Sequence, residues 1–235
     1  MSKDNGLFLH EEILLLALKD EEGTIAPGTM YQYAIGGAAL AELLLRRRIG
    51  LVEHRSRKLV GVIDPEPVGD SLIDECLSRI VAAKRRASLD TWVSRVAESR
   101  DLTHRIARQL CHRGILRADE EEILLIFTRK IYPEIDAKPE RQLLARLHEA
   151  IFTDTPNVEP RTVVLASLAN SARILNALFD RKMLRQRKQR IEQIVNGEIT
   201  GKATKEAIEA MEAAMAIVFL MPMMMSSLNA GAHSG

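Results

Sequence analysis

The segment LFLHEEILLLALKDEEG, residues 7–23, decides the fold class of this chain. It has acidic residues near its start, a leucine-rich centre and Gly23 at its end. Carboxylates favour the first turn of a helix, and glycine is preferred just past the last turn. The segment therefore predicts a short buried helix that ends at Gly23.

Helical patterns continue towards the C-terminus. Thr29 with Gln32, and Ser71 with Asp74, have the spacing of capping boxes, which mark helix starts. Aromatic residues make up only 4% of the chain, and helix-favouring Ala, Leu, Glu, Arg and Lys dominate its middle and end. We expect Trp92 to be the buried anchor of one short helix. The expected helices span residues 29–48, 71–84, 88–98, 100–113, 139–152, 160–178, 180–195 and 203–221.

Two β-favouring stretches interrupt the helices. IGLVEHRSRKLVGVID, residues 49–64, contains the polar tip Arg55-Ser56-Arg57. ILLIFTRKIYPEI, residues 123–135, contains the triplet Thr128-Arg129-Lys130. Each stretch predicts a short β-hairpin that turns at its polar residues.

Length and segmentation indicate a single domain. The chain has 235 residues and no convincing linker, so it fits one globular, mostly α domain with two short β-hairpins. We expect this domain to span residues 7–222, between a flexible N-terminus at 1–6 and a flexible tail at 223–235.

Charge and targeting signals indicate a cytoplasmic protein. Lys and Arg number 33 against 32 Asp and Glu, so an electrostatic partner must be recognised by a local patch. The first six residues lack the features of a signal peptide, and the apolar stretch at 213–225 is interrupted by Pro222. That stretch is shorter than the roughly 20 residues of a membrane span. Cys76 and Cys111 are too few for a disulfide framework and suit a reducing compartment.

Motifs for catalysis or metal binding are weak. His104 and His112 could share a helix face, but Arg108 between them opposes a cation. Asp70 and Asp74 lie in an acidic cluster that could bind a cation or transfer protons, although capping of a helix start is the stronger interpretation. We expect no catalytic residues, no metal, no cofactor and no enzymatic activity.

Two basic clusters are more informative. Each holds six cationic residues, with a single acid in the first and none in the second. They could contact an anionic surface, either lipid headgroups or nucleic-acid phosphate. The alternative is a solvated face or a partner for the acidic runs near Glu21 and Glu121. The first cluster consists of Arg46, Arg47, Arg48, Arg55, Arg57 and Lys58, and the second of Arg181, Lys182, Arg185, Arg187, Lys188 and Arg190.

Six motifs in order resemble the Golgi phosphoprotein 3 family. Beyond the opening segment they are AELLLRRRIGL, DPEPVGDSLIDECLSRI, RQLCHRGIL, LLIFTRKIYP and VVLASLANSARILNALF. Together they are spread over residues 7 to about 220. The resemblance implies a helical, non-catalytic adaptor that binds phosphatidylinositol 4-phosphate at the Golgi membrane.

The resemblance also implies a headgroup pocket, from which this chain departs. The family pocket combines a tryptophan and an arginine near the second helix with two arginines of a central helix. Here the first arginine falls on Gly36, the tryptophan is missing, and the other two arginines fall on Arg100 and Thr103. Arg105 is close enough in sequence to substitute. We interpret the chain as a divergent member and hypothesise a prokaryotic source.

Three functions compete. The leading hypothesis is a peripheral membrane-binding adaptor that recognises phosphatidylinositol 4-phosphate or another anionic headgroup. The alternative is a cytosolic oligomeric scaffold that has lost lipid binding, because the resemblance implies self-association through the second hairpin. Nucleic-acid binding through the helix at Arg181 is disfavoured by the near-zero net charge and by the shortage of aromatic stacking groups. The predicted lipid-binding residues are Arg100, Arg105, Arg181, Arg185 and Lys188, and the predicted oligomerisation residues are Phe127, Thr128, Arg129, Lys130, Ile131 and Tyr132.

Overall fold

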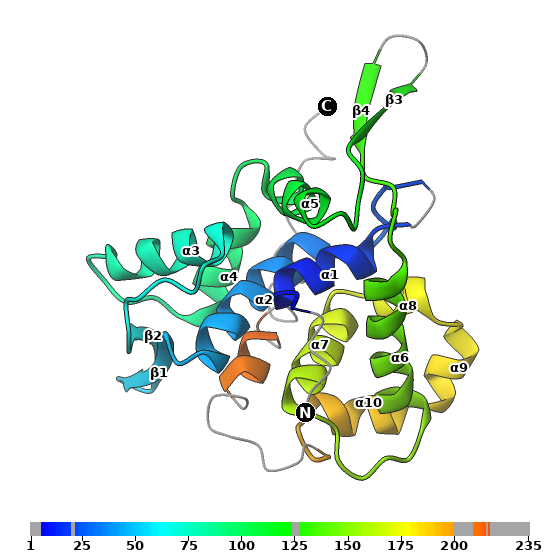
Figure 1. The fold of residues 1–235 in the computed structure, drawn as a ribbon. Coiled ribbons are helices and arrows are strands. Elements are labelled where there is room, and N and C mark those ends of the chain that lie inside the picture. Colours follow the sequence, from blue (N-terminus) through cyan, green and yellow to red (C-terminus); the bar gives the residue numbers. More distant parts are fainter. Residues whose placement is uncertain (1–5, 20–21, 124–126, 200–208, 215, 217–235) are drawn as a thin grey trace, which may run out of the picture.

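A computed structural model describes residues 6–19, 22–123, 127–199, 209–214 and 216 (Figure 1). The helices with defined bounds are α1 (Leu9–Ala17), α2 (Tyr31–Leu45), α3 (Ser71–Val81), α4 (Leu89–Ala97), α5 (Leu102–His112), α6 (Lys138–Phe152), α7 (Pro160–Ser171), α8 (Leu175–Leu178), α9 (Arg181–Gln186) and α10 (Lys188–Val195). The strands are β1 (Ile49–His54), β2 (Arg57–Val62), β3 (Asp119–Ile123) and β4 (Phe127–Ile131). The prediction of a mostly helical domain with two short hairpins is confirmed.

Helices α1 and α2 form the centre of the molecule. Every residue of α1 is buried, as the leucine-rich segment predicts. In Figure 1, α3 and α4 lie on one side of this pair, and α6 to α10 lie on the other. One apolar core runs through both sides. Its fully or almost fully buried members include Leu14, Leu40, Leu77, Val93, Leu147 and Leu168. Trp92 is also buried, as predicted.

The first hairpin has the predicted turn. Strands β1 and β2 pair antiparallel, with His54 opposite Arg57. The two residues between them, Arg55 and Ser56, have φ angles of 46° and 61°. Positive φ at both turn positions is the geometry that matches the twist of a two-residue hairpin. Residues 209–214 are helical and contact this hairpin through the Lys58 Nζ to Glu212 Oε1 bond of 2.5 Å.

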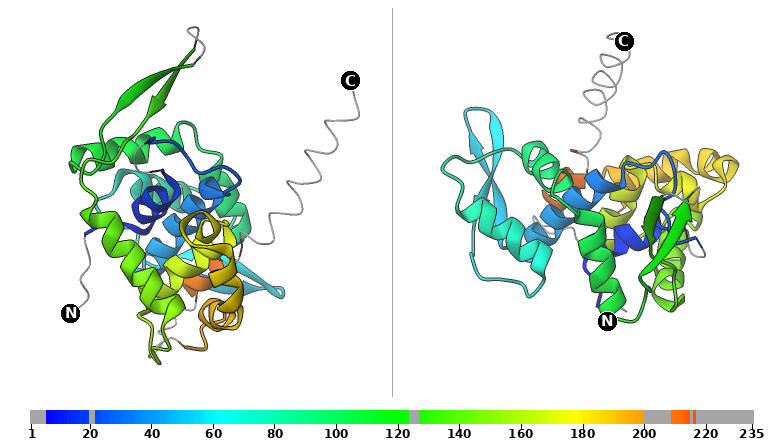
Figure 2. Two further views of the ribbon diagram at one scale, coloured as in Figure 1. Left: turned by 90° about the vertical axis from the view of Figure 1, so that its right-hand side faces the viewer. Right: turned by 90° about the horizontal axis from the view of Figure 1, so that it is seen from above.

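The second hairpin differs from the prediction. Thr128 to Lys130 lie inside β4, and the acidic run that we placed before the hairpin is β3 itself. Lys130 pairs with Glu120 in this register, and cross-strand pairs of opposite charge favour such pairing. The connection at residues 124–126 lies outside the described residues. Figure 2 shows the two strands projecting from the helical body.

Several helix ends also differ from the prediction. Helix α1 ends at Ala17, because Leu18 becomes extended and forms a bridge with Ile25. Gly23 lies beyond that bridge, where its carbonyl accepts the Tyr132 N–H at 2.9 Å. A side chain at Gly23 would collide with the backbone at Tyr132, so the glycine allows docking of the hairpin base.

Interruptions divide two of the predicted helices. The helix expected over 160–178 breaks after Ser171, and the one expected over 180–195 breaks at Arg187. The helix predicted at 29–48 is shorter in the structure, where α2 spans Tyr31–Leu45. The Thr29 hydroxyl donates to the Ala26 carbonyl and does not cap this helix. Of the helix predicted at 203–221, only residues 209–214 and 216 are described.

The expected boundary at residue 222, the tail and residues 1–5 lie outside the described residues. Within the described ranges, the helices are too short or too polar to cross a bilayer.

Candidate anionic-ligand surfaces

Cationic side chains gather where α9 meets α10. Arg181, Arg185 and Lys188 line one groove of about 500 Å³. These three residues recur at helical spacing in the sequence, and the structure brings them together. The apolar lining of the groove comes from Leu175, Leu184 and Ile191.

The charge of this groove is largely uncompensated. Arg181 and Arg185 are exposed, and neither forms an ion pair with another residue in the described part of the chain. The Nζ of Lys188 lies 3.6 Å from Oε1 of Glu192, but both side chains remain exposed. An exposed pair of this kind contributes little to stability, so Lys188 can exchange Glu192 for another anion.

Two other cations of the second cluster have structural roles. Arg187 donates to the carbonyls of Ile151 and Thr153, each at 2.8 Å. Arg190 donates to the carbonyl of Ala150 at 3.0 Å. The last carbonyls of a helix lack helical partners and favour a positive charge, so these two arginines fasten α10 to the end of α6. The cationic cluster of the sequence thus separates into an exposed part and a part that stabilises the fold.

Arg100 and Arg105 belong to a different surface. They line a shallow pocket of about 400 Å³ beside α3 and α4, together with Arg79, Arg95, Glu75 and Glu98. The side chain of Arg100 is 96% exposed, with its Nε 3.7 Å from Asp101 Oδ2. Arg105 donates to Glu75 Oε2 at 2.5 Å. Figure 1 shows α3 to α5 across the α1–α2 pair from α9 and α10, so the five predicted lipid-binding residues form two sites.

Gly36 and Thr103, the two positions where the resemblance placed pocket arginines, lie in different surroundings. Gly36 is buried where α2 packs against α4, and a Cβ there would lie 2.5 Å from the Val93 carbonyl oxygen. An arginine therefore cannot occupy this position in the present packing. Thr103 does line a pocket, of about 460 Å³, where its hydroxyl donates to the Tyr31 hydroxyl at 3.3 Å.

Strand β4 supplies cations to that pocket, which sequence reasoning missed. Arg129 and Lys130 line it beside His104 and Tyr132. His104 Nδ1 lies 2.9 Å from the Tyr132 hydroxyl, and Tyr132 is buried at the hairpin base. A motif search could not associate β4 with α5, because only the docking of the hairpin brings these residues together.

The first basic cluster is mostly engaged within the fold. Arg46 Nε donates to Glu42 Oε1 at 2.7 Å, and Arg48 pairs with Asp64. Lys58 contacts the helix at 209–214, as described above. These contacts favour the structural interpretation of this cluster over a binding surface.

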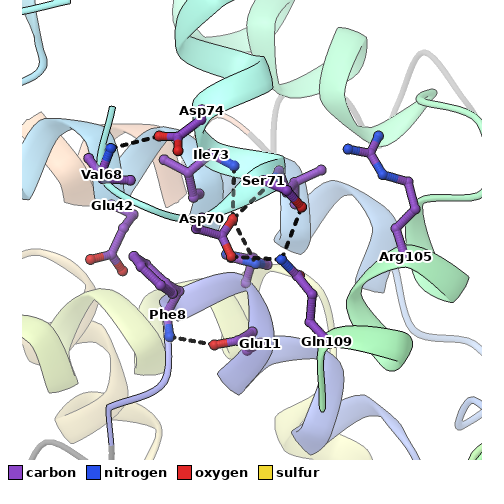
Figure 3. Close-up of polar contacts among 12 residues, drawn as sticks. Phe8, Glu11, Glu42, Val68, Asp70, Ser71, Ile73, Asp74, Arg105 and Gln109 are labelled. Atoms are coloured by element: carbon purple, nitrogen blue, oxygen red, sulfur yellow. Dashed lines mark hydrogen bonds and ion pairs between the residues drawn. The ribbon is translucent and has the colours of Figure 1, made fainter. Parts of the chain in front are cut away.

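The acidic cluster at α3 caps a helix, although not through the predicted residue. Asp70, rather than Ser71, is the N-cap, because its Oδ1 accepts the N–H groups of Leu72 and Ile73 (Figure 3). Asp74 accepts the Val68 N–H at 2.7 Å. The second oxygen of Asp70 accepts from Gln109 of α5 at 2.9 Å. The capping interpretation is therefore confirmed, with the cap one residue earlier.

A buried ionic network holds α1, α2 and α7 together. Arg161 donates to both oxygens of Glu42, at 3.3 and 3.1 Å, and to the Leu7 carbonyl at 2.7 Å. Burial alone would raise the pKa of Glu42, but Arg161, the Leu9 N–H and Arg46 lower it overall. Glu42 and Arg161 are paired with each other and largely closed to solvent, so they are poorly placed to act on a substrate.

The fold and its surfaces define the class of protein: a helical domain with two hairpins and cationic grooves at its surface. Residues 9–211 match the family described as Golgi phosphoprotein 3 (GPP34), and the chain belongs to that family. It is also similar to vacuolar protein sorting-associated protein 74 of Eremothecium gossypii, with 26% identity over 200 residues. That alignment covers 75% of this chain and 60% of the relative, so the chain spans less than two thirds of the relative's length.

Proposed function

We propose that the protein is a peripheral membrane adaptor that binds an anionic lipid headgroup, such as phosphatidylinositol 4-phosphate, on the cytoplasmic side of a membrane. The observation that carries this proposal is the groove between α9 and α10. Its cations, Arg181, Arg185 and Lys188, surround an apolar floor. Cationic side chains with nearby apolar groups suit the headgroup region of an anionic bilayer.

Recognition by this surface is delocalised. Each Lys or Arg near an anionic membrane contributes about 1 kcal/mol, and that contribution falls with salt. The pocket of Arg100 and Arg105 contributes less, because Glu75 already neutralises Arg105. The protein acts by binding rather than by catalysis, in keeping with its family.

The proposal is tested by co-sedimentation with vesicles across a salt series. The vesicles are neutral, or contain phosphatidylserine or phosphatidylinositol 4-phosphate at matched surface charge. The variant Arg181→Ala/Arg185→Ala/Lys188→Ala should lose most binding to anionic vesicles. A matched control, Lys84→Ala/Arg85→Ala/Arg86→Ala, removes three exposed cations from the turn after α3 and should retain binding. Equal losses in both variants would reject the groove as the membrane surface.

A second candidate function is an oligomeric scaffold. The observation that favours it is the projecting second hairpin, whose strand β4 exposes Arg129 and Lys130 (Figure 2). A hairpin of two strands leaves both outer edges available for pairing with another chain. Phe127 to Ile131 remain the proposed self-association segment, whereas buried Tyr132 anchors the hairpin to α5.

A further inference from the structure

A second cavity adjoins the groove between α9 and α10. It has a volume of about 960 Å³ and lies between the end of α1, the loop at Pro27 and Gly28, α6 and α8. This size suits a small ligand. Arg181 and Asn176 line both the cavity and the groove, so the two are neighbours. Apolar lining comes from Leu16, Leu18, Leu144 and Leu178.

Two cations of this cavity are available to a ligand. Arg173 and Arg181 are exposed, and the described residues provide no ion pair for either. The third cation, Lys19, is bound by Glu22 at 2.9 Å. The remaining carboxylate of the lining, Glu140, is buried. The lining therefore carries two exposed guanidinium groups that have no ion pair in the described part of the chain, together with the buried carboxylate of Glu140.

The backbone at Arg173 has the geometry of a helix C-terminus. Helix α7 ends in a Schellman motif, in which the Ile174 N–H bonds to the Ala169 carbonyl at 2.8 Å. This motif places Arg173 in the left-handed region, with φ of 61°. Helices α5 and α10 end in the same way, with Gly114 and Gly197 at the equivalent position. Helix α2 ends in this way with Arg47, so an arginine at this position is strained relative to glycine but does not by itself mark a ligand site.

We propose that this cavity binds a phosphomonoester, held by the guanidinium groups of Arg173 and Arg181 and by the amide of Asn176. Guanidinium groups bind phosphate oxygens in pairs of parallel hydrogen bonds, and two of them balance the charge of the dianion. The phosphomonoester can belong to a lipid headgroup or to a soluble metabolite. The lipid source rests on the proposed membrane function, whereas the binding chemistry does not.

The first test uses a soluble probe. Titration calorimetry with glycerol 3-phosphate at fixed ionic strength should show one site on the parent protein. Arg173→Gly should weaken binding by about tenfold or more, because it removes a charge-assisted contact while leaving the helix end relaxed. The matched control is Arg47→Gly, at the same position of the Schellman motif that ends α2, where φ is 57°. This control should bind like the parent.

The outcomes of these measurements either reject the site or identify the source of the phosphomonoester. No heat with the parent, or equal binding by Arg173→Gly, overturns the proposal. Vesicles with phosphatidic acid are then compared with phosphatidylglycerol vesicles of matched charge, and Arg173→Gly should lose only the preference for phosphatidic acid. Calorimetric binding without any vesicle binding supports a soluble phosphomonoester and rejects the membrane function. Vesicle binding with a silent titration leaves the membrane function standing and rejects this site.

Discussion

At the scale of the residue, His10 is a titratable group buried in the core. It is fully buried, its ring stacks on Phe8, and its Nε2 lies 3.5 Å from Asp70 Oδ1. Neither ring nitrogen forms a hydrogen bond. Burial lowers the pKa of His10, and the opposing attraction of Asp70 and Glu42 does not restore it. The imidazole is therefore neutral in the folded protein at neutral pH.

This lowered pKa predicts a loss of stability in mild acid. Below the ordinary histidine pKa of 6.5, the unfolded chain takes up a proton at His10 that the folded chain does not. The free energy of unfolding should therefore fall as the pH drops below 6.5. Urea unfolding of the parent and of His10→Leu across this window measures the effect, and the variant should have the flatter profile.

Two buried carboxyls change the free energy of unfolding with pH in the opposite direction from His10. The effect of His10 is therefore measured by comparing the parent with His10→Leu. Burial raises the pKa of Glu11 and of Glu12, so their contribution to stability falls as the pH rises above 4.5. Both residues are present in the parent and in His10→Leu, so the difference between the two curves isolates His10. Parallel profiles would contradict the prediction.

The strained Arg173 predicts an increase in stability on mutation. Arg173→Gly should raise the free energy of unfolding by up to about 1 kcal/mol, because glycine adopts the left-handed conformation without a Cβ clash. Chemical denaturation provides the measurement. A less stable variant would show that the Arg173 side chain makes compensating contacts within the fold.

At Gly36, a change to alanine should have the opposite effect on stability from the one that helix propensity predicts. Gly→Ala in a helix interior normally stabilises by roughly 1 kcal/mol. At Gly36, however, the new Cβ meets the Val93 carbonyl oxygen at 2.5 Å, and backbone must move. Gly36→Ala should therefore destabilise the protein by about 1–3 kcal/mol, as overpacked cores do. An unchanged or raised melting temperature would refute this close approach of α2 and α4.

At the scale of the element, the sequence predicted which segments are helical more reliably than where they end. Periodicity located α3, α4 and α5 within a few residues, because their apolar stripes face the core. The same periodicity predicted a helix that continued past the end of α7, since nothing in the local sequence marks Arg173 as a left-handed residue. The cap of α3 was misplaced by one residue because Asp70 and Ser71 are both good caps, and Gln109 on α5 supports Asp70.

The register of the second hairpin determines which residues can be removed to test its self-association. Removing residues 127–132 would also remove Tyr132, which is buried against His104. Replacing residues 120–130 by Asn-Gly instead closes a two-residue turn between Asp119 and Ile131, which are paired in the register. If the hairpin mediates assembly, this variant should sediment more slowly than the parent at equal helicity. An unchanged mass distribution would reject the scaffold function.

At the scale of the whole molecule, the candidate site was only partly predictable. Helical spacing placed Arg181, Arg185 and Lys188 on one continuous helix, whereas the structure divides them between α9 and α10 and still brings them to one groove. It could not reveal that Arg187 and Arg190 bind the end of α6, because those contacts span more than thirty residues. Arg173 carried no signal in the sequence, since its position depends on how α7 ends.

Because the two cationic surfaces are separate, their contributions to membrane binding can be compared directly. Arg100 and Arg105 line a pocket with residues of α3 and α4, and these helices lie across the central pair from α9 (Figure 1), so a membrane that contacts one surface does not engage the other fully. If the groove at α9 and α10 faces the membrane, the Arg181, Arg185 and Lys188 triple variant should lose at least as much binding as Arg100→Ala/Arg105→Ala. The expected loss for the triple variant approaches about 3 kcal/mol at low salt and shrinks with screening. Co-sedimentation at two salt concentrations, with and without phosphatidylinositol 4-phosphate at matched charge, provides the comparison. A phosphoinositide-specific signal abolished only by the Arg100 and Arg105 variant would place headgroup recognition on the opposite side, beside α4 and α5.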